Sequence, residues 1–308
     1  MRMAMPIRLV LLSASIVTSA CSGSPPAPAA PAPQDRAAAP NVTDLMPAFW
    51  SCWEQAEKKT PAEQVRLLKE VAIAPHHDFY EKVIGIPSDD RLQEILATLT
   101  PSIPALRRID GEFKDQLPKG FASFLAAFPD MDAGLPIYLG PSLFTSSGQS
   151  RDLDGRTIVF YGLDVMAVVL SDVTNHVPDI HHEMFHAYHW QRNPEMREAG
   201  KDAFEKTRTS PMYYDLWSEG LALYAVQKLN PEAPLSLVLA SKALPEEGPK
   251  VLRRVAGELR QRLDVTNYVG LRLAEQVGEG RSMEDLVRLG GKDLRAAVES
   301  GLETLEKP

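Results

Sequence analysis

Two histidines four residues apart constrain this chain more than any other feature. His182 and His186 enclose Glu183 in the pattern HExxH. In an α-helix, residues four apart lie one turn apart on the same face, so both imidazoles can reach one metal ion while Glu183 lies beside them. Helix-start residues precede the pattern and an Asn-Pro pair follows it, which predicts a helix over 178–192.

A third metal ligand is expected from a second helix. A catalytic zinc site has three protein ligands and one open position for water, so two histidines leave one ligand to be found. Glu219 lies 33 residues after His186, in a helix predicted over about 215–230. Gly220 follows it, and its missing side chain would let this helix approach the first closely.

Together these two patterns resemble a known class of enzymes. HExxH followed by a second helix with the run Glu219–Ala222, which reads EGLA, resembles the gluzincin class of zinc metallopeptidases, especially the peptidase MA-like group of bacterial zinc proteases. The resemblance covers about residues 160–270. It implies a zincin-like fold in which the two histidines and Glu219 bind Zn²⁺. It also implies that Glu183 is the general base.

The class also implies a donor that stabilises the oxyanion, commonly a tyrosine downstream of the glutamate ligand. The run Asn267–Gly270 resembles that element and makes Tyr268 the first candidate. Tyr224, five residues after Glu219, is the alternative. Either tyrosine could instead pack in the core with its hydroxyl hydrogen-bonded.

Two further histidines in the motif are not expected to bind the metal. His181 points about 100° away from its neighbour on the helical wheel. His189 lacks the Gly and third His of the metzincin pattern, and so is assigned to the surface or to a supporting position. Asp164, Asp172 and Asp179 could each hold the other ring nitrogen of a ligand histidine, and the sequence does not choose among them.

The predicted fold class is α+β, mostly α, with a small β-sheet before the active-site helix. Residues 41–130 read as an N-terminal helical part of a single domain, 41–308, with helices over Val42–Lys59, Pro61–Ala74, Asp89–Leu99 and Ile103–Leu117. Two short β-branched and aromatic runs predict strands, Leu135–Leu139 and Thr157–Tyr161, with a loop over 145–150 between them.

The second of these strands is also a candidate binding element. In peptidases of the HExxH type, a strand just before the active-site helix commonly binds extended substrate by edge pairing. Residues 157–162 are therefore the candidate edge. The alternative is an ordinary core strand whose edge is covered.

The first forty residues predict export. Arg2 and Arg8 precede an apolar run that is too short to span a bilayer, and small residues end at Ala20, so 1–20 reads as a signal peptide. The run Val17–Cys21 resembles a bacterial lipobox, although Thr stands where Leu is typical. A lipid on Cys21 is expected, with simple secretion as the alternative.

A Pro/Ala-rich segment, 21–40, follows and reads as a semi-rigid tether. We therefore expect an exported protein, periplasmic or on the cell surface, that meets the membrane only through Cys21. If Cys21 carries a lipid, Cys52 has no intramolecular partner, and no structural disulfide is expected.

The composition of the chain limits the kinds of molecule that it is expected to bind. The chain of 308 residues is 44% hydrophobic and 24% charged, as in soluble globular proteins, and its net charge of -8 argues against nucleic acid. A peptide or protein substrate is expected, and the sequence does not indicate an oligomeric state.

The function predicted from these residues is zinc-dependent hydrolysis of peptide bonds by a metal-activated water. An endopeptidase is favoured, because Tyr161–Ala167 lacks the Glu of the exopeptidase signature found in the aminopeptidases of the class. The alternative is a catalytically idle, zincin-fold lipoprotein that binds peptide or cell-envelope material.

Overall fold

The computed structural model describes residues 39–198, 212–241, 243–258 and 266–306. These residues lie in one compact unit, Ala38–Pro308. The predicted signal peptide, nearly all of the predicted tether and Cys21 lie outside the described residues. In the described part of the chain, no helix combines the length and the apolar composition needed to cross a bilayer.

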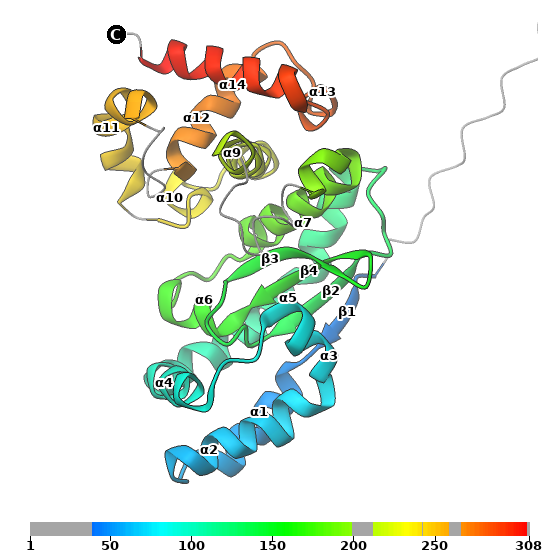
Figure 1. Ribbon diagram of the computed structural model, residues 1–308, viewed down its shortest axis with the longest axis vertical. Coiled ribbons are helices and arrows are strands. Elements are labelled where there is room, and N and C mark those ends of the chain that lie inside the picture. The colour runs from blue at the N-terminus through cyan, green and yellow to red at the C-terminus, as the bar shows by residue number, and fades with distance from the viewer. Residues whose placement is uncertain (1–38, 199–211, 242, 259–265, 307–308) are drawn as a thin grey trace, which may run out of the picture. The chain divides into compact units, whose positions relative to one another are not determined.

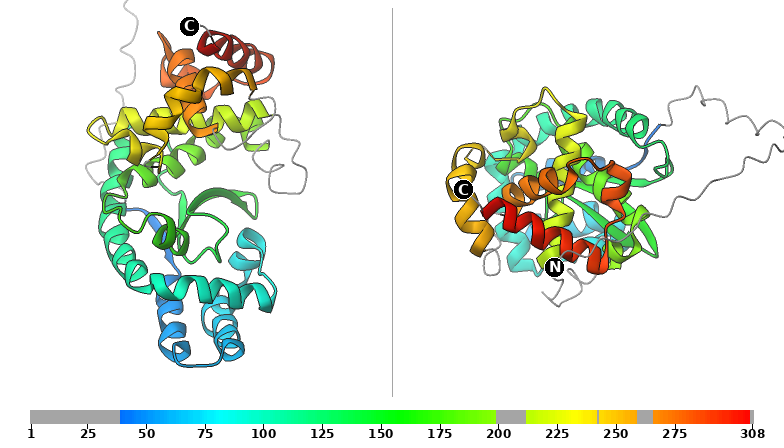
Figure 2. Two further views of the ribbon diagram at one scale, coloured as in Figure 1. Left: turned by 90° about the vertical axis from the view of Figure 1, so that its left-hand side faces the viewer. Right: turned by 90° about the horizontal axis from the view of Figure 1, so that it is seen from above.

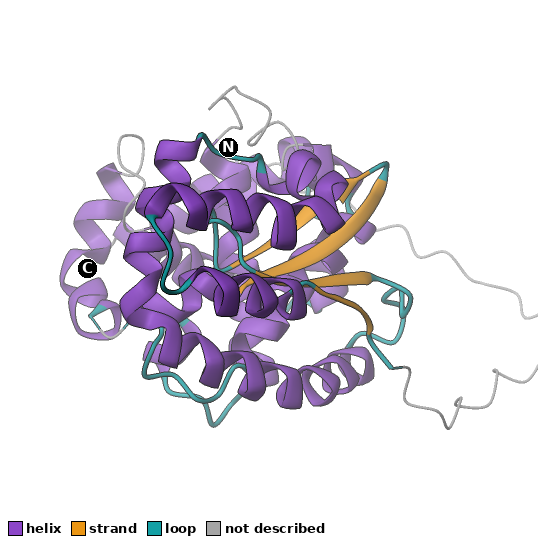
Figure 3. Ribbon diagram, turned by 90° about the horizontal axis from the view of Figure 1, so that it is seen from below, coloured by secondary structure: helices purple, strands orange, loops and turns teal. Residues whose placement is uncertain are grey.

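A mixed sheet of four strands stands among many helices (Figure 3), in agreement with the predicted α+β, mostly α, class. Its strands are β1 (Asn41–Asp44), β2 (Pro136–Gly140), β3 (Gly148–Leu153) and β4 (Arg156–Gly162). They lie in the order β1-β2-β4-β3. The first three pair in parallel, and β3 pairs antiparallel to β4, so β1 and β3 form the edges.

The sheet differs from the prediction in its two edges. The predicted strands correspond to β2 and β4, but β1 occupies the start of the predicted helix Val42–Lys59, and β3 begins inside the predicted loop. β4 pairs on both sides, so the prediction that 157–162 forms the exposed edge is wrong. The edge beside β4 is β3.

The buried strand β4 presents alternate side chains to two layers of helices. The hydroxyl of Tyr161 donates to the carbonyl of Ile180 in α7 (Val177–Arg192) at 2.9 Å. On the opposite face, the ring of Phe160 packs against that of Phe79, with centroids 5.2 Å apart. Because strand side chains alternate between faces, these contacts fix the register that holds α7 against one face of the sheet.

Before β2, the chain is helical apart from β1. The α-helices of this part are α1 (Met46–Ala56), α2 (Pro61–Leu67), α3 (His77–Phe79), α4 (Asp89–Leu99) and α5 (Ile103–Ala127). Between them stand the shorter π and 3₁₀ turns η1 (Leu68–Ile73), η2 (Ala74–His76), η3 (Tyr80–Ile84) and η4 (Thr100–Ser102). The bounds of α4 are those predicted, whereas α5 continues past its predicted end to Ala127.

After the sheet, α7 lies between the strands and the C-terminal helices (Figures 1 and 2). The elements that follow β4, besides α7, are α6 (Leu163–Val169), α9 (Met212–Leu229), α10 (Leu235–Val238), α11 (Leu244–Glu258), α12 (Thr266–Gly278), α13 (Met283–Val287) and α14 (Gly291–Glu306). α9 therefore contacts α7 on one side and α12 on another.

The helix α9 approaches α12 through glycine. A Cβ placed on Gly220 would lie 2.1 Å from the carbonyl oxygen of Gly270, and a Cβ on Gly270 would lie 3.0 Å from Cα of Gly220. The missing side chain of Gly220 thus allows close packing, as expected, but against α12 instead of the helix that carries HExxH. The backbone of α9 therefore packs directly against the backbone of α12.

Candidate metal centre

The three predicted ligands meet in the structure. His182 and His186 lie one turn apart on α7, with their Nε2 atoms 3.0 Å apart. The carboxylate of Glu219, from α9, approaches Nε2 of His182 at 3.4 Å and Nε2 of His186 at 3.5 Å. All the ligand atoms lie within 4.8 Å of one another, so these three residues could hold a metal ion. His182, His186 and Glu219 are called the metal group below.

The spacing suits a tetrahedral ion. Metal–nitrogen bonds of about 2.0–2.1 Å at the tetrahedral angle place two ligand atoms about 3.3 Å apart, close to the three separations observed here. The side chain of Glu219 is 40% exposed, against 19% and 10% for the two histidines. The group is therefore open to solvent on the side of Glu219, where a fourth ligand could enter.

The charge of Glu219 also suits a cation. Burial would raise the pKa of this carboxyl, but the imidazoles of His186 and His182 outweigh that effect and hold the pKa well below its usual value. Glu219 is therefore ionised at neutral pH. Two imidazoles and one carboxylate form the ligand set of many catalytic zinc sites.

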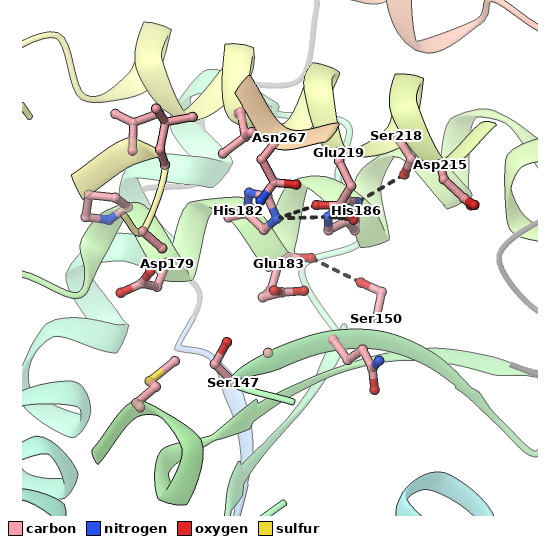
Figure 4. A pocket seen from close by; sticks show the side chains of 18 of the residues that line it. Ser147, Ser150, Asp179, His182, Glu183, His186, Asp215, Ser218, Glu219 and Asn267 are labelled. Carbon is pink, nitrogen blue, oxygen red and sulfur yellow. Dashed lines mark hydrogen bonds and ion pairs between the residues drawn. The ribbon is translucent and has the colours of Figure 1, made fainter. Parts of the chain in front are cut away.

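Glu183 lies between this group and the edge strand β3 (Figure 4). Its backbone carbonyl accepts a hydrogen bond from Ser150 Oγ at 3.1 Å. A Cβ placed on Gly148 would lie 2.6 Å from Oε1 of Glu183, so only glycine leaves room for the carboxylate in this position. Burial raises the pKa of Glu183 to about 7, although the adjacent His182 opposes the shift. A carboxyl with such a pKa can exchange protons near neutral pH.

The second nitrogen of one ligand histidine has a partner that the sequence reasoning missed. Ser218 Oγ lies 3.3 Å from Nδ1 of His186. Ser218 immediately precedes Glu219 on α9, and that adjacency to a candidate ligand was the signal that could have identified it.

The three aspartates considered for that role lie elsewhere. Asp164, which is 1% exposed, accepts hydrogen bonds from the backbone N–H groups of Ser142 and Phe144 at 2.7 and 2.9 Å. It thereby supports the loop that leads into β3. Asp179 faces Nδ1 of the buried His176 at 3.6 Å, and Asp172 is exposed.

His181 lies outside the metal group and links α7 to α5 and to Asn230, the residue after α9. Its Nε2–H donates to the carbonyl of Gly120 at 3.1 Å, and its Nδ1 accepts from the side-chain amide of Asn230 at 3.0 Å. Burial lowers the pKa of His181 to about 4, so the ring is neutral at pH 7. His189 is fully buried behind the site, and burial lowers its pKa to about 3.

The structure does not bring Tyr268 to the metal group. It is 5% exposed, belongs to a hydrophobic cluster with Leu223 and Leu239, and packs its ring against Gly248. On α12 the preceding residue, Asn267, lines the cleft instead, because successive residues of a helix are rotated by about 100°. Tyr268 therefore does not occupy the place expected of an oxyanion donor.

Tyr224, the alternative, also lies away from the cleft. A Cβ on Gly278 would meet its hydroxyl at 3.2 Å, and Lys228 lies over its ring. Of the tyrosines with described side chains, Tyr214 lines the cleft, and its hydroxyl donates to Glu195.

A cleft of about 470 Å³ surrounds the metal group and extends along α7. One end is lined by Asp179 near the start of α7, by Met166 of α6 and Val238 of α10, and by Leu170 and Leu239, which directly follow those two helices. The other end is lined by Trp190, Met196, Tyr214 and Asp215. One wall of the cleft consists of residues 148–150 of β3 together with Ser147, which precedes the strand. Figure 4 shows this wall facing the HExxH helix.

Comparisons of the chain with protein-family models, with curated proteins and with solved structures find no match.

Proposed function

We propose that the chain is a zinc-dependent peptidase with a zincin-like fold. His182, His186 and Glu219 would hold Zn²⁺, and Glu183 would act as the general base. One observation carries the proposal: the ligand atoms of the first three residues converge within 4.8 Å, beside a buried carboxyl and an edge strand that lines the cleft. A metal site with a neighbouring base and a place for extended chain suits the hydrolysis of peptides.

Zinc bound at these ligands would lower the pKa of a coordinated water to about 7 and polarise the carbonyl of the substrate. Glu183 accepts the proton of the attacking water, whose oxygen bonds to the carbonyl carbon. The carbon–nitrogen bond then breaks, and Glu183 delivers the proton to the leaving amine. Its pKa, raised to about 7 by burial, suits both transfers.

The edge strand β3 positions the substrate in this proposal. β3 pairs only with β4 within the described sheet, and residues 148–150 line the cleft beside Glu183. An extended peptide can add to such an edge through backbone hydrogen bonds, which hold it independently of its side chains. The cleft accommodates chain on both sides of the metal group, which favours an endopeptidase.

The sequence of the N-terminal segment supports a location in the cell envelope for this activity. We propose that residues 1–20 direct export and that a lipid on Cys21 anchors the protein, with 21–40 as a tether. The substrates would then be peptides, or exposed segments of proteins, on the periplasmic or outer side of a membrane.

A second candidate function is a catalytically idle lipoprotein that uses the same cleft to bind peptide or cell-envelope material. One observation favours it: neither Tyr268 nor Tyr224 lines the cleft, so the tyrosine that the enzyme class uses to stabilise the oxyanion has no counterpart at either expected position.

Metal analysis combined with the variant Glu183→Gln separates the two functions. The purified chain should hold one zinc per molecule and cleave casein or a peptide library, and Glu183→Gln should retain zinc while losing cleavage. Glu279→Gln, an exposed carboxylate on the surface, is the matched control and should behave as wild type. Absence of stoichiometric zinc would exclude the peptidase. Equal cleavage by wild type and Glu183→Gln would favour the binding protein.

A further inference from the structure

A second cavity, of about 330 Å³, lies beside the HExxH helix and outside the cleft that contains the metal group. Four segments line it: the loop before β2, the turn that enters β4, the C-terminal half of α7, and the residues that follow α7. Small-molecule sites usually have volumes of about 300–1,000 Å³, so the second cavity has room for a compact ligand.

The helix α7 presents different faces to the cleft and to the second cavity. The three residues of the HExxH pattern line the cleft, whereas Ala187 and Gln191, one turn apart, line the second cavity. Trp190 lies where the two faces meet and lines both. A ligand in the second cavity would therefore lie against a side chain that also forms part of the cleft.

The protein side chains give the two cavities opposite charge. Among the described residues that line the cleft, four are carboxylates and none is a lysine or an arginine. The second cavity is lined by Arg156, Arg197 and one carboxylate, Asp132. Two positive charges and one negative charge give this lining a formal charge of +1, in a chain whose net charge is -8. Of the two cavities, the second is therefore the one whose side chains attract an anion.

Arg197 has a buried donor that the described protein does not use. Its Nη2 donates to the carboxylate of Asp152 and to the carbonyl of Gly155, at 2.5 and 2.7 Å. Its Nε is buried and has no hydrogen-bond partner among the described residues. A buried N–H without an acceptor is destabilising, and an oxygen of a ligand would supply the missing acceptor.

Arg156, the first residue of β4, is tied to another part of the lining. Its Nη2 donates to the carbonyl of Gly134 at 2.6 Å, in the loop that contributes Asp132 to the cavity. The carboxylate of Asp132 accepts from the backbone N–H of Gly134 at 2.8 Å, within the same loop. The second cavity thus has guanidinium groups from two separate elements of the fold.

Much of the remaining lining is apolar and buried. Met131, Leu135, Ala187 and Trp190 line the second cavity and are each less than 10% exposed. All four belong to the main hydrophobic core, so the core opens onto this cavity. An apolar group bound here would be removed from water, which is favourable in proportion to its buried area.

We propose that the second cavity binds a small organic carboxylate. Its apolar group would pack against Met131, Leu135 and Trp190, and its carboxylate would meet Arg156 and Arg197. A carboxylate suits a guanidinium because it can accept two parallel hydrogen bonds, and its single charge matches the lining. The C-terminal residue of a peptide and a free organic acid share this chemistry. The inference depends neither on the metal group nor on the proposed peptidase function.

Calorimetric titration of the full chain with N-acetyl-leucine tests the site. The titration is made after treatment with a chelator and again with zinc, because a carboxylate can also bind zinc in the cleft. We expect a Kd of about 1 mM in both forms, as suits a ligand of this size. Binding only in the presence of zinc, or no binding in either form, would overturn the proposal.

Three related probes separate the parts of the ligand. N-acetyl-leucinamide lacks the charge and acetate lacks the apolar group, so each should bind at least about tenfold more weakly than N-acetyl-leucine. Equal affinity for N-acetyl-leucine and its amide would overturn the proposal. 4-Methylpentanoate keeps the carboxylate and the apolar group without the peptide amide. Its affinity distinguishes a free acid, if equal to that of N-acetyl-leucine, from a peptide C-terminus, if weaker, and either result supports a carboxylate site.

Removing either guanidinium should weaken binding. Arg156→Gln and Arg197→Gln should each raise the Kd of N-acetyl-leucine at least about tenfold. Arg281→Gln, at an exposed arginine that lines neither cavity, is the matched control and should bind as wild type. Thermal melting establishes that the variants fold, and Arg156→Gln decides the test if the loss of the Arg197 contacts prevents folding. Wild-type affinity in folded Arg156→Gln would overturn the proposal.

Trp190 provides a signal that locates the ligand. The tryptophan fluorescence of the chain should change on addition of N-acetyl-leucine, with the same Kd as in calorimetry. In Trp190→Phe the fluorescence change should be lost while calorimetry still detects binding. A fluorescence change that persists in Trp190→Phe would place the ligand elsewhere and overturn the proposal.

Discussion

Ser218 Oγ lies 3.3 Å from Nδ1 of His186, and the next residue of α9, Glu219, reaches Nε2 of the same ring at 3.5 Å. Adjacent residues of one helix thus contact both nitrogens of one imidazole on another helix. With Nε2 bound to the proposed metal ion, Nδ1 would carry the proton and donate it to Ser218 Oγ. The contact is compatible with the tautomer that a metal ligand needs, because a hydroxyl can accept the proton of Nδ1–H.

Removing that hydroxyl should weaken metal binding. We expect Ser218→Ala to lower zinc affinity by about tenfold or more, the usual effect of losing a partner of a ligand histidine. Ser218→Thr, which keeps the hydroxyl, should bind zinc nearly as wild type. Competition with a fluorescent chelator measures both affinities. Ser300→Ala, at an exposed serine of α14, is the control for the loss of a hydroxyl alone. Unchanged affinity in Ser218→Ala would mean that the contact does not orient the ring.

Gly148, which lies against the proposed base Glu183, should matter for turnover more than for metal binding. Gly148→Ala places a methyl group 2.6 Å from the carboxylate of Glu183, which must then move away from its position beside the metal group. We expect kcat to fall about a hundredfold, since small displacements of a catalytic group have effects of this size, while zinc content stays at one per chain.

The matched control for this variant is Gly111→Ala. Gly111 lies in α5, and a Cβ there meets no atom within 4 Å. It should leave kcat unchanged and stabilise the fold by about 0.5–1 kcal/mol, because alanine favours a helix over glycine. Full activity in Gly148→Ala would show that Glu183 does not need the space that this glycine leaves.

The helix that carries HExxH and the third candidate ligand could be predicted from the sequence because their signals are local. HExxH on a helix fixes the relation of His182 to His186, and a glutamate followed by glycine on a later helix completes the set. Strand β3 escaped prediction because its sequence, GQSRDL, is polar and only Ser150 is buried. These residues form a strand because they pair with β4, and a local sequence pattern does not contain that pairing.

Tyr268 shows a different limit. The sequence pattern identifies a later helix with a tyrosine near a glycine. A shift of one position along that helix changes which side chain faces the cleft, because successive residues are rotated by about 100°. The close contact of Gly220 with Gly270 sets the rotation of α12 and presents Asn267 instead. Helix rotation depends on packing between helices, so a motif can identify the helix and still miss the residue.

The glycine contact between α9 and α12 should be sensitive to a single methyl group. In Gly220→Ala the new Cβ would lie 2.1 Å from the backbone carbonyl of Gly270, which cannot move aside like a side chain. We expect a loss of about 1–3 kcal/mol in the free energy of unfolding, the usual cost of overpacking. Urea unfolding measures the loss. Because α9 carries Glu219, zinc affinity should fall in the same variant, and unchanged stability would contradict the packing described here.

Burial of Cys52 should make the stability fall as the pH rises. The thiol is free and 3% exposed, and burial raises its pKa to about 11. An unfolded chain ionises this thiol near pH 8.5, so the native state loses stability as the pH rises from about 8.5 toward 11 and keeps it in full below that range. The loss between pH 8 and pH 10 should be about 2 kcal/mol. Urea unfolding of wild type and Cys52→Ala at both pH values isolates this contribution, because the other titrating groups are common to both proteins. An equal pH dependence in the two proteins would show that Cys52 ionises as readily in the native state as in the unfolded chain.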